Sequence, residues 1–230
     1  MITEKEFQKN LVILRDRLEE ACSFSNRSVE DVEILPVTKN WPVQAVHYAQ
    51  RAGFFRVGEN RVQEALKKKS SVEGMEWDLI GHLQSNKAKQ VTGQFSRVQT
   101  VDSSKLLGKL NLASSKLNVK TSILLQVNTG KDPAKNGILE EQCEEFVDKT
   151  LGYSSLVLEG FMTMAPFAPD DPQVARNAFS RLRDLKEKMS TQFSISLSEL
   201  SMGMTGDLRE AIAEGSTMIR VGSALFGQRE

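Results

Sequence analysis

The sequence has few of the residues on which metal sites, disulfide frameworks and histidine catalysis depend. Its 230 residues include two cysteines and two histidines. Cys22 and Cys143 lie far apart in the chain, a usage typical of reduced thiols in a cytosolic protein and not of a disulfide framework. His47 and His82 do not provide a cluster of metal ligands, so we expect no bound metal.

An excess of one charge and long apolar runs are also missing. The chain carries 30 lysines and arginines against 30 aspartates and glutamates. A net charge of zero argues against general attraction to nucleic acid or anionic membranes, so we expect neither as a partner. No segment approaches the ~20 apolar residues of a membrane-spanning helix, and the first residues resemble no signal or transit peptide. We therefore expect a soluble, cytoplasmic protein.

The sequence does contain a regular alternation of apolar runs and helical patterns. Thr3 and Glu6 have the spacing of a capping box, and the apolar residues that follow recur at helical intervals, which predicts an N-terminal helix. Eight apolar runs predict buried strands at residues 32–37, 54–57, 77–80, 98–101, 123–127, 156–164, 197–202 and 218–221. A helix is expected after Pro42, and further helical patterns cover residues 61–69, 84–91, 103–117, 139–149, 172–189 and 207–214.

Alternating strands and helices are typical of a parallel sheet that is buried on both faces. Eight such units in a chain of this length fit a closed (β/α)8 barrel better than an open sheet. We therefore predict one α/β TIM-barrel domain over residues 1–230. Little sequence follows the eighth strand, so the extra N-terminal helix is expected to cover the position of a last barrel helix.

Lys39 comes directly after the first predicted strand. Functional side chains of such barrels lie where strands end and the following loops begin. A lysine that is partly removed from water favours the neutral amine, which is the form that attacks a carbonyl in Schiff-base chemistry. The alternative is a lysine that extends its charged end to water at the barrel rim.

The loops after strands seven and eight resemble a phosphate-binding site. Small residues let backbone N–H groups approach an anion and add hydroxyl donors, and the candidates are Ser201, Gly203, Thr205, Gly222 and Ser223. Tight turns are the simpler explanation for each loop alone. Arg220 lies in an apolar run and needs a partner, for which Glu59 and Asp207 are candidates. The three lysines at 67–69 are expected to form a solvated helix end.

A lysine, a phosphate site and an arginine at one barrel mouth suggest two kinds of ligand. One is pyridoxal 5′-phosphate (PLP), and the other is a phosphosugar that forms a Schiff base. Position alone does not distinguish them.

Seven motifs carry a resemblance to a known family. They occupy residues 37–39, 57–64, 80–87, 126–128, 135–137, 200–204 and 219–222. In order and spacing they resemble the YggS/PROSC family of PLP homeostasis (PLP-binding) proteins, over nearly the whole chain. Asp78 departs from the pattern, because the family usually has histidine or tyrosine there, and residues 132–134 are also atypical.

The resemblance implies a PLP-binding barrel of the alanine racemase N-terminal-domain type. In this chain it implies that Lys39 forms the internal aldimine, that Arg220 faces the pyridine nitrogen and that Asn60 lies beside the ring. An arginine does not readily give up its proton, so the pyridine nitrogen stays unprotonated and the ring is a weak electron sink.

The same resemblance implies the phosphate contacts. Ser201, Gly222 and Ser223 are expected to hold the phosphate, with help from the backbone near Gly203 and Met204. It assigns no catalytic residue.

The function implied is non-enzymatic. We expect a protein of intracellular vitamin B6 homeostasis that buffers PLP or delivers it to apo PLP-dependent enzymes, with effects on the balance of amino acids and keto acids. The alternative is a PLP-dependent enzyme resembling an amino-acid racemase. Such racemases use a second base and an additional β-domain, which this chain is not expected to have. A monomer is expected for the same reason.

Overall fold

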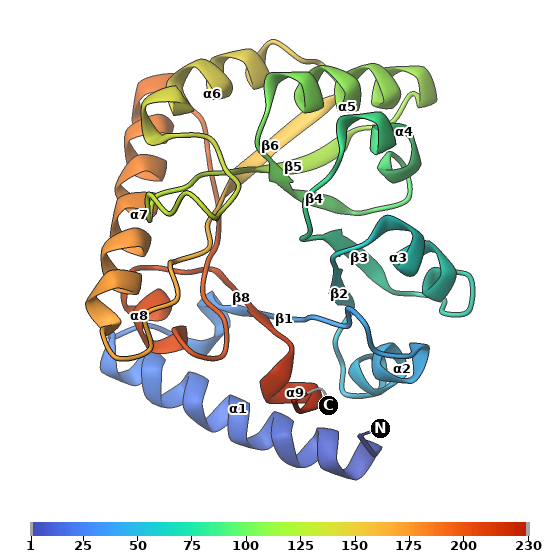
Figure 1. The fold of residues 1–230 in the computed structure, drawn as a ribbon, viewed down its shortest axis with the longest axis vertical. Coiled ribbons are helices and arrows are strands. Elements are labelled where there is room, and N and C mark those ends of the chain that lie inside the picture. The colour runs from blue at the N-terminus through green and yellow to red at the C-terminus, as the bar shows by residue number, and fades with distance from the viewer. Residues whose placement is uncertain (1, 229–230) are drawn as a thin grey trace.

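The structure is a computed structural model, and it describes residues 2–228. Eight parallel strands form a barrel with helices around it (Figure 1). The strands are β1 (Glu33–Pro36), β2 (Arg56–Glu59), β3 (Glu76–Leu79), β4 (Arg97–Val101), β5 (Thr121–Gln126), β6 (Leu156–Met162), β7 (Glu199–Ser201) and β8 (Met218–Val221). Each predicted apolar run overlaps one of them, with boundaries that differ by up to two residues, so the predicted α/β barrel is confirmed.

The order of the strands brings the first and the last one together. The sheet runs β1-β8-β7-β6-β5-β4-β3-β2, and β1 pairs with β8 through four residue pairs, which include Leu35 with Arg220. Between β1 and β2 there is a single bridge, Val37 to Gly58. There the Thr38 N–H donates to the Gly58 carbonyl at 3.1 Å. The barrel therefore closes immediately before Lys39.

The helices lie around the outside of the barrel (Figure 1). They are α1 (Glu4–Phe24), α2 (Val43–Arg51), α3 (Val62–Lys69), α4 (Ala88–Val91), α5 (Ser104–Leu117), α6 (Cys143–Leu151), α7 (Pro172–Phe193), α8 (Leu208–Ala213) and α9 (Ser223–Phe226). Short 3-10 turns are η1 (Val29–Asp31), η2 (Ser85–Lys87) and η3 (Glu140–Gln142), so the predicted helices over 84–91 and 139–149 each begin with a tighter turn. Within residues 2–228, no helix has the length and apolarity to cross a membrane.

The N-terminal helix α1 completes the barrel wall. Thr3 and Glu6 form the predicted capping box, and the apolar face of the helix is buried. Phe7 stacks on Phe226 of α9 with ring centroids 5.4 Å apart, and α1 also packs on α8. The last helix, α9, has only four residues. The expectation that α1 covers the gap left by a short last helix is confirmed.

We predict that the buried face of α1 is essential for stability. Leu14 is 1% exposed, whereas the adjacent Ile13 is 49% exposed. Leu14→Ala should lower the free energy of unfolding by about 2–5 kcal/mol, because it removes buried methyl groups and leaves a cavity. Ile13→Ala should change it by only about 0.5 kcal/mol. Chemical denaturation measures both values, and equal losses would show that α1 does not pack on the barrel as described.

Candidate functional site

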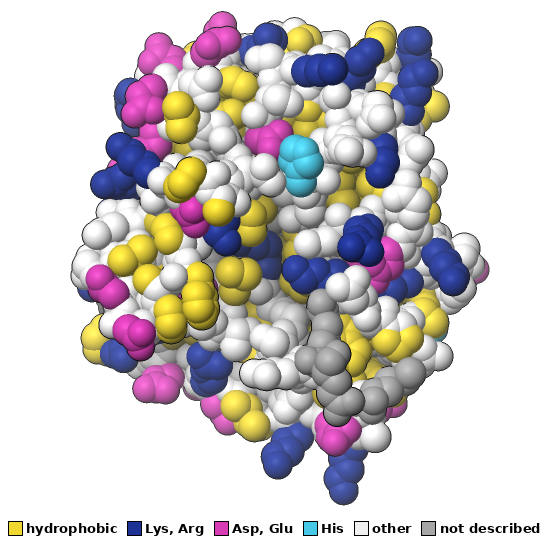
Figure 2. Space-filling view, in the orientation of Figure 1, with side chains coloured by type: hydrophobic (Ala, Val, Ile, Leu, Met, Phe, Trp, Pro, Cys, Tyr) yellow, Lys and Arg dark blue, Asp and Glu magenta, His cyan; other side chains and the backbone are white. Residues whose placement is uncertain are grey.

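The predicted site residues come together at the carboxyl ends of four neighbouring strands. Lys39 and Asn60 follow β1 and β2, Gly203 and Met204 follow β7, and Ser223 begins α9 after β8. These strands are adjacent in the order β7-β8-β1, with β1 closing on β2. In the orientation of Figure 1, lysine and arginine side chains gather around a hollow near the centre of the visible face (Figure 2).

The backbone on both sides of Lys39 is held by hydrogen bonds. Thr38 is completely buried, and its hydroxyl donates to Glu59 Oε1 at 2.6 Å. Asn40 adopts a left-handed conformation (φ 59°), which asparagine tolerates, and its N–H donates to Glu64 Oε1 at 2.5 Å. Lys39 itself is half-buried. Its position at the mouth is therefore set by its two neighbours.

A buried lysine completes this arrangement. Lys68 is 7% exposed, and its Nζ donates to the Thr38 carbonyl at 2.7 Å, to Glu59 at 2.6 Å and to Glu64 at 2.8 Å. Burial raises the pKa of Glu59, and the hydrogen bonds from Lys68 and Thr38 oppose that rise. The expectation that residues 67–69 form a solvated helix end is wrong for Lys68, which lies on the buried face of α3 with Val62 and Ala65.

Arg220 lies inside the barrel and is 4% exposed. Its Nη1 donates to the carbonyl and the hydroxyl of Ser201 at 2.7 and 2.9 Å, and its Nη2 donates to the Thr163 carbonyl at 2.8 Å. Burial lowers its pKa to about 10, partly offset by the charge of Asp207, so it remains a cation at neutral pH. Glu59 was a candidate partner, but it binds Lys68 instead.

None of the hydrogen bonds found among residues 2–228 uses the Arg220 Nε–H. A guanidinium has five N–H donors in a fixed geometry. The bonds to Ser201 and Thr163 hold one end of the group, which leaves Nε as a donor for a ligand.

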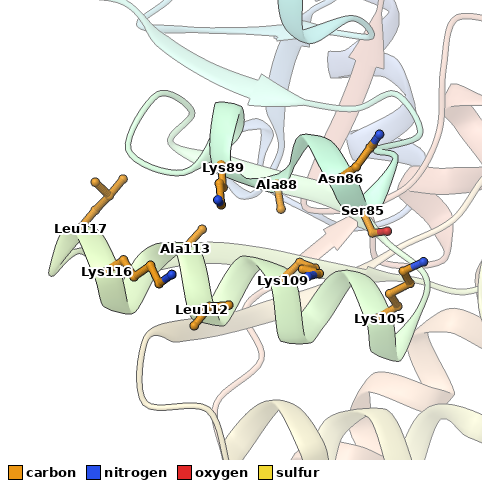
Figure 3. A pocket seen from close by; sticks show the side chains of 10 residues that line it. All are labelled: Ser85, Asn86, Ala88, Lys89, Lys105, Lys109, Leu112, Ala113, Lys116 and Leu117. Atoms are coloured by element: carbon orange, nitrogen blue, oxygen red, sulfur yellow. The ribbon is translucent and has the colours of Figure 1, made fainter.

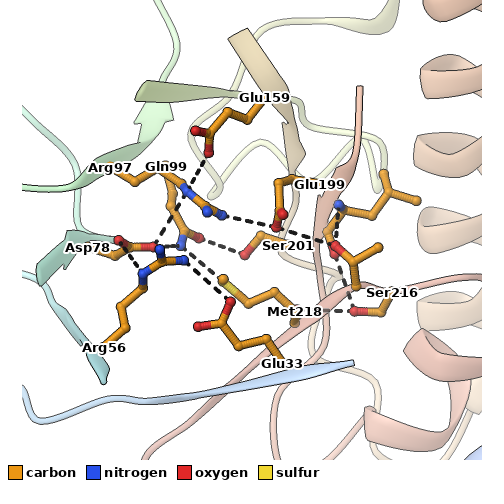
Figure 4. A network of polar contacts seen from close by, with 12 residues as sticks. Glu33, Arg56, Asp78, Arg97, Gln99, Glu159, Glu199, Ser201, Ser216 and Met218 are labelled. Carbon is orange, nitrogen blue, oxygen red and sulfur yellow. Dashed lines mark hydrogen bonds and ion pairs between the residues drawn. The ribbon is translucent and has the colours of Figure 1, made fainter. Parts of the chain in front are cut away.

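Behind Arg220, a chain of hydrogen bonds crosses the barrel interior (Figure 4). The Ser201 hydroxyl donates to Gln99 Oε1 at 2.6 Å, and Gln99 Nε2 donates to Asp78 Oδ2 at 2.7 Å. Ser201, Gln99 and Asp78 are each completely buried. The chain links the guanidinium near the mouth to a carboxylate deep in the barrel.

The donors and acceptors of this chain run in one direction. Arg220 has no acceptor, so the Ser201 oxygen must accept from it and the Ser201 hydrogen must point to Gln99. Gln99 must therefore present its carbonyl to Ser201 and its NH₂ to Asp78. The Oδ2 atom of Asp78 accepts from that NH₂ group, so the carboxyl group is matched to this orientation of Gln99.

Asp78 belongs to a charged cluster at the amino ends of the strands (Figure 4). Arg56 and Arg97 lie 3.6 and 3.9 Å from its carboxylate, and Arg97 also contacts Glu159 at 2.8 Å and Glu199 at 3.0 Å. Burial raises the pKa of Asp78 to about 7, and the two arginines and Gln99 only partly oppose this. One of its oxygens, Oδ1, is buried without a hydrogen bond among the described residues.

The loops after β7 and β8 face each other across the mouth. Gly203 has φ +95°, and a side-chain carbon there would lie 2.4 Å from the Ala211 Cβ, so this turn requires glycine. The Met204 N–H donates to Asp207 Oδ1 at 2.6 Å. The hydroxyls of Thr205 and Ser223 lie 3.4 Å apart.

Ser201 has surroundings different from those expected for a phosphate ligand. Its hydroxyl is completely buried and already contacts Gln99 and Arg220. Asn60 lies at the mouth, and its Oδ1 is buried without a hydrogen-bond partner among the described residues. Gly222 is half-buried, and a side-chain carbon at this position would lie 3.5 Å from the Val37 carbonyl oxygen.

Sequence reasoning missed Gln99 and Lys68. Gln99 lies two residues from Arg97 and two from Val101 in its strand, and side chains two residues apart share one face. The spacing therefore places Gln99 on the same face as the charged Arg97. Lys68 follows Val62 and Ala65 at intervals of three, which is the spacing of one helix face. Both signals are present in the sequence.

We predict that Lys68 stabilises the fold by compensating the buried charge of Glu59. Lys68→Met should lower the free energy of unfolding by about 3–5 kcal/mol, because it leaves a buried carboxylate without its partner. Lys67→Met is the matched control, since Lys67 is exposed in the same helix. Denaturant titration measures the difference. A Lys68→Met variant as stable as Lys67→Met would contradict the interpretation.

We also predict a pH dependence that Asp78 controls. With a pKa raised to about 7, the folded protein binds this proton more tightly than the unfolded chain between about pH 4 and pH 7. Stability should therefore fall as pH rises through that window, by on the order of 4 kcal/mol from this group. Asp78→Asn should remove this slope in denaturant titrations at several pH values, whereas Asp184→Asn at an exposed position should keep it.

Comparison with known proteins agrees with this geometry. A family model described as the alanine racemase N-terminal domain matches residues 11–230. A pyridoxal phosphate homeostasis protein of Aquifex aeolicus is 32% identical over 217 residues, which cover 94% of this chain and 95% of that protein. One from Haemophilus influenzae is 35% identical over 227 residues, covering 96% and 95%.

A solved structure extends the match to three dimensions. PipY of Synechococcus elongatus, with PLP bound, is 32% identical and has a TM-score of 0.80, covering 91% of this chain and 99% of that one. The chain therefore belongs to the alanine racemase N-terminal-domain family, and within it to the pyridoxal phosphate homeostasis proteins.

Proposed function

We propose that this protein binds PLP at the barrel mouth and serves to buffer or deliver it. The observation that carries the proposal is that Lys39 directly follows β1 and Arg220 lies in β8, the strand with which β1 pairs. An amine and a buried cation with a spare donor at one mouth match the aldehyde and the ring nitrogen of PLP. The PLP-bound relative, PipY, supports the same ligand.

The residues at the mouth fit the other parts of this cofactor. Asn60 Oδ1 lacks a hydrogen-bond partner within residues 2–228, which leaves it able to accept from a polar group of a ligand. Thr205 and Ser223 present two hydroxyls from facing loops, and a phosphate accepts hydrogen bonds from such donors. The donor set therefore suits an aromatic phosphate with an aldehyde.

We assign one role to each side chain. The Lys39 amine would condense with the PLP aldehyde, forming a carbon–nitrogen bond as the aldehyde oxygen leaves in water. Arg220 would donate Nε–H to the ring nitrogen. For the phosphate we favour Thr205, Ser223 and the backbone near Gly222 and Gly203, since the Met204 N–H already donates to Asp207. Ser201 would hold Arg220 and not the phosphate, because both of its interactions are already made.

The proposed role is carriage and not catalysis. PLP supplies an electrophilic aldehyde and an electron-withdrawing ring, and that ring withdraws most when its nitrogen is protonated. Arg220 remains a donor at neutral pH, so it would hold the nitrogen in its unprotonated form. Homologues named as homeostasis proteins support this reading. Delivery would serve apo PLP-dependent enzymes and thereby affect the balance of amino acids and keto acids.

We predict that covalent retention of PLP depends on Lys39. The wild-type protein incubated with PLP should become yellow, and borohydride should fix the cofactor to the peptide that contains Lys39. Lys39→Ala should lose the visible absorbance, since the substitution removes the amine that we assign to the carbon–nitrogen bond. Lys87→Ala, which removes a half-buried lysine of η2, should keep it. A wild-type protein that takes up no PLP would refute the proposal.

The carrier role is tested on the same PLP-loaded protein. Amino acids incubated with it in heavy water should show no exchange of the α-proton above the rate with free PLP. Transfer to an apo-enzyme should continue in the presence of a scavenger of free PLP. Steady racemisation of any amino acid would establish an enzyme instead.

A further inference from the structure

A groove lined by lysines lies between α4 and α5, outside the barrel (Figure 3). We call it the basic groove, and its volume is about 580 Å³. Its walls contain four lysines and no acidic residue, and the lining residues are Ser85, Asn86, Ala88, Lys89, Lys105, Lys109, Leu112, Ala113, Lys116 and Leu117. The site proposed for PLP uses none of these residues.

The four lysines are available for a partner. Among residues 2–228, no ion pair or hydrogen bond involves the side chains of Lys89, Lys105, Lys109 or Lys116. Lys105, Lys109 and Lys116 are spaced by four and seven residues, which places them along one face of α5. Figure 3 shows them along the length of that helix, with Lys89 on the opposite wall pointing toward it.

The groove also has an aliphatic part. Leu112 and Leu117 are 46% and 55% exposed, and they lie between and beside the lysines of α5. Ala88 and Ala113 are buried between the two helices. A ligand that fits must therefore offer negative charges together with aliphatic side chains.

This local charge is large in a chain whose net charge is zero. Residues 79–131 contain seven lysines and one acidic residue, Asp102, and their single arginine, Arg97, is buried in ion pairs with Glu159 and Glu199. Asp102 lies 3.2 Å from the ring of His82, in the loops beside the groove. A region with this imbalance attracts an acidic partner over a distance of about 10 Å at moderate salt.

One end of the groove reaches the barrel mouth. Ser85 and Asn86 follow β3, and Lys105 is in the first turn of α5 after β4, so these three residues lie at the carboxyl ends of strands. From Lys105 to Lys116 the helix extends about 16 Å. A bound segment of about three helical turns would fill the groove and place the partner beside the mouth.

We propose that the basic groove binds an acidic, amphipathic segment of a partner protein, with carboxylates on the lysines and one or two aliphatic side chains on Leu112 and Leu117. Nucleic acid fits less well, because the lining has no aromatic residue for stacking and no arginine. The proposal goes beyond PLP binding and does not depend on it.

The test uses the full chain and a fluorescent synthetic peptide of about three helical turns, with glutamates on one face and leucines on the other. Anisotropy should show saturable binding that weakens with salt. Lys105→Glu/Lys109→Glu should raise Kd about tenfold or more. Lys5→Glu/Lys9→Glu on α1 is the matched control, with the same charge change, the same spacing and exposed lysines, and it should leave Kd unchanged.

Further measurements separate the charged contribution to binding from the aliphatic one, and they test nucleic acid and a second copy of this chain as other occupants of the groove. A peptide with glutamine for glutamate should not bind, and Leu112→Ser should weaken binding without changing its salt dependence. Absence of peptide binding, or equal loss in the α1 control, would overturn the proposal. Tighter binding of a single-stranded oligonucleotide, lost in the same α5 variant, would also overturn it. So would a dimer seen by light scattering that Lys105→Glu/Lys109→Glu dissociates.

Discussion

The architecture of the site depends on a guanidinium buried inside the barrel. Burying a cation without a carboxylate in contact is costly, and the protein offsets that cost with the carbonyls of Ser201 and Thr163 and the Ser201 hydroxyl. These acceptors come from the ends of β6 and β7, so Arg220 is in place only when three strands are in register. The same requirement for hydrogen-bond partners continues deeper into the barrel. The buried Ser201 hydroxyl needs an acceptor, which is Gln99, and the Gln99 NH₂ group needs an acceptor, which is Asp78.

Much of the fold could be predicted from the sequence, and the reason is physical. A parallel barrel buries both faces of each strand, so the strands are visible as short apolar runs, and eight of them with helices between leave few arrangements. Lys39 and the loops after β7 and β8 were also predictable, since polar residues directly after apolar runs fall at the carboxyl face. The partner of Arg220 was not predictable, because two backbone carbonyls leave no trace in the sequence.

Lys68 and Gln99 show a second limit. Both side chains are polar and both are buried, and composition alone assigns such residues to the surface. Only the register of α3 shows that the middle lysine of the three faces inward, whereas its neighbour Lys67 faces solvent. Charge counts have the same weakness. A net charge of zero does not reveal that lysines are concentrated along α5. A count over the whole chain therefore argues only against partners attracted by net charge, and not against partners attracted by a local charged surface.

The single bridge between β1 and β2 has a mechanical consequence. One backbone hydrogen bond, from the Thr38 N–H, joins β1 to β2, whereas β1 and β8 share four residue pairs. The hydrogen bonds from Lys68 to the Thr38 carbonyl and to Glu59 supply the rest of the connection between β1 and β2. Local opening of a fold starts where backbone pairing is thinnest. Opening at this seam separates Lys39 from Asn60, which lie on its two sides. It leaves Lys39 and Arg220 together, because their strands remain paired. The side of the mouth formed by β1 and β8 is therefore held by more backbone pairing than the side formed by β1 and β2.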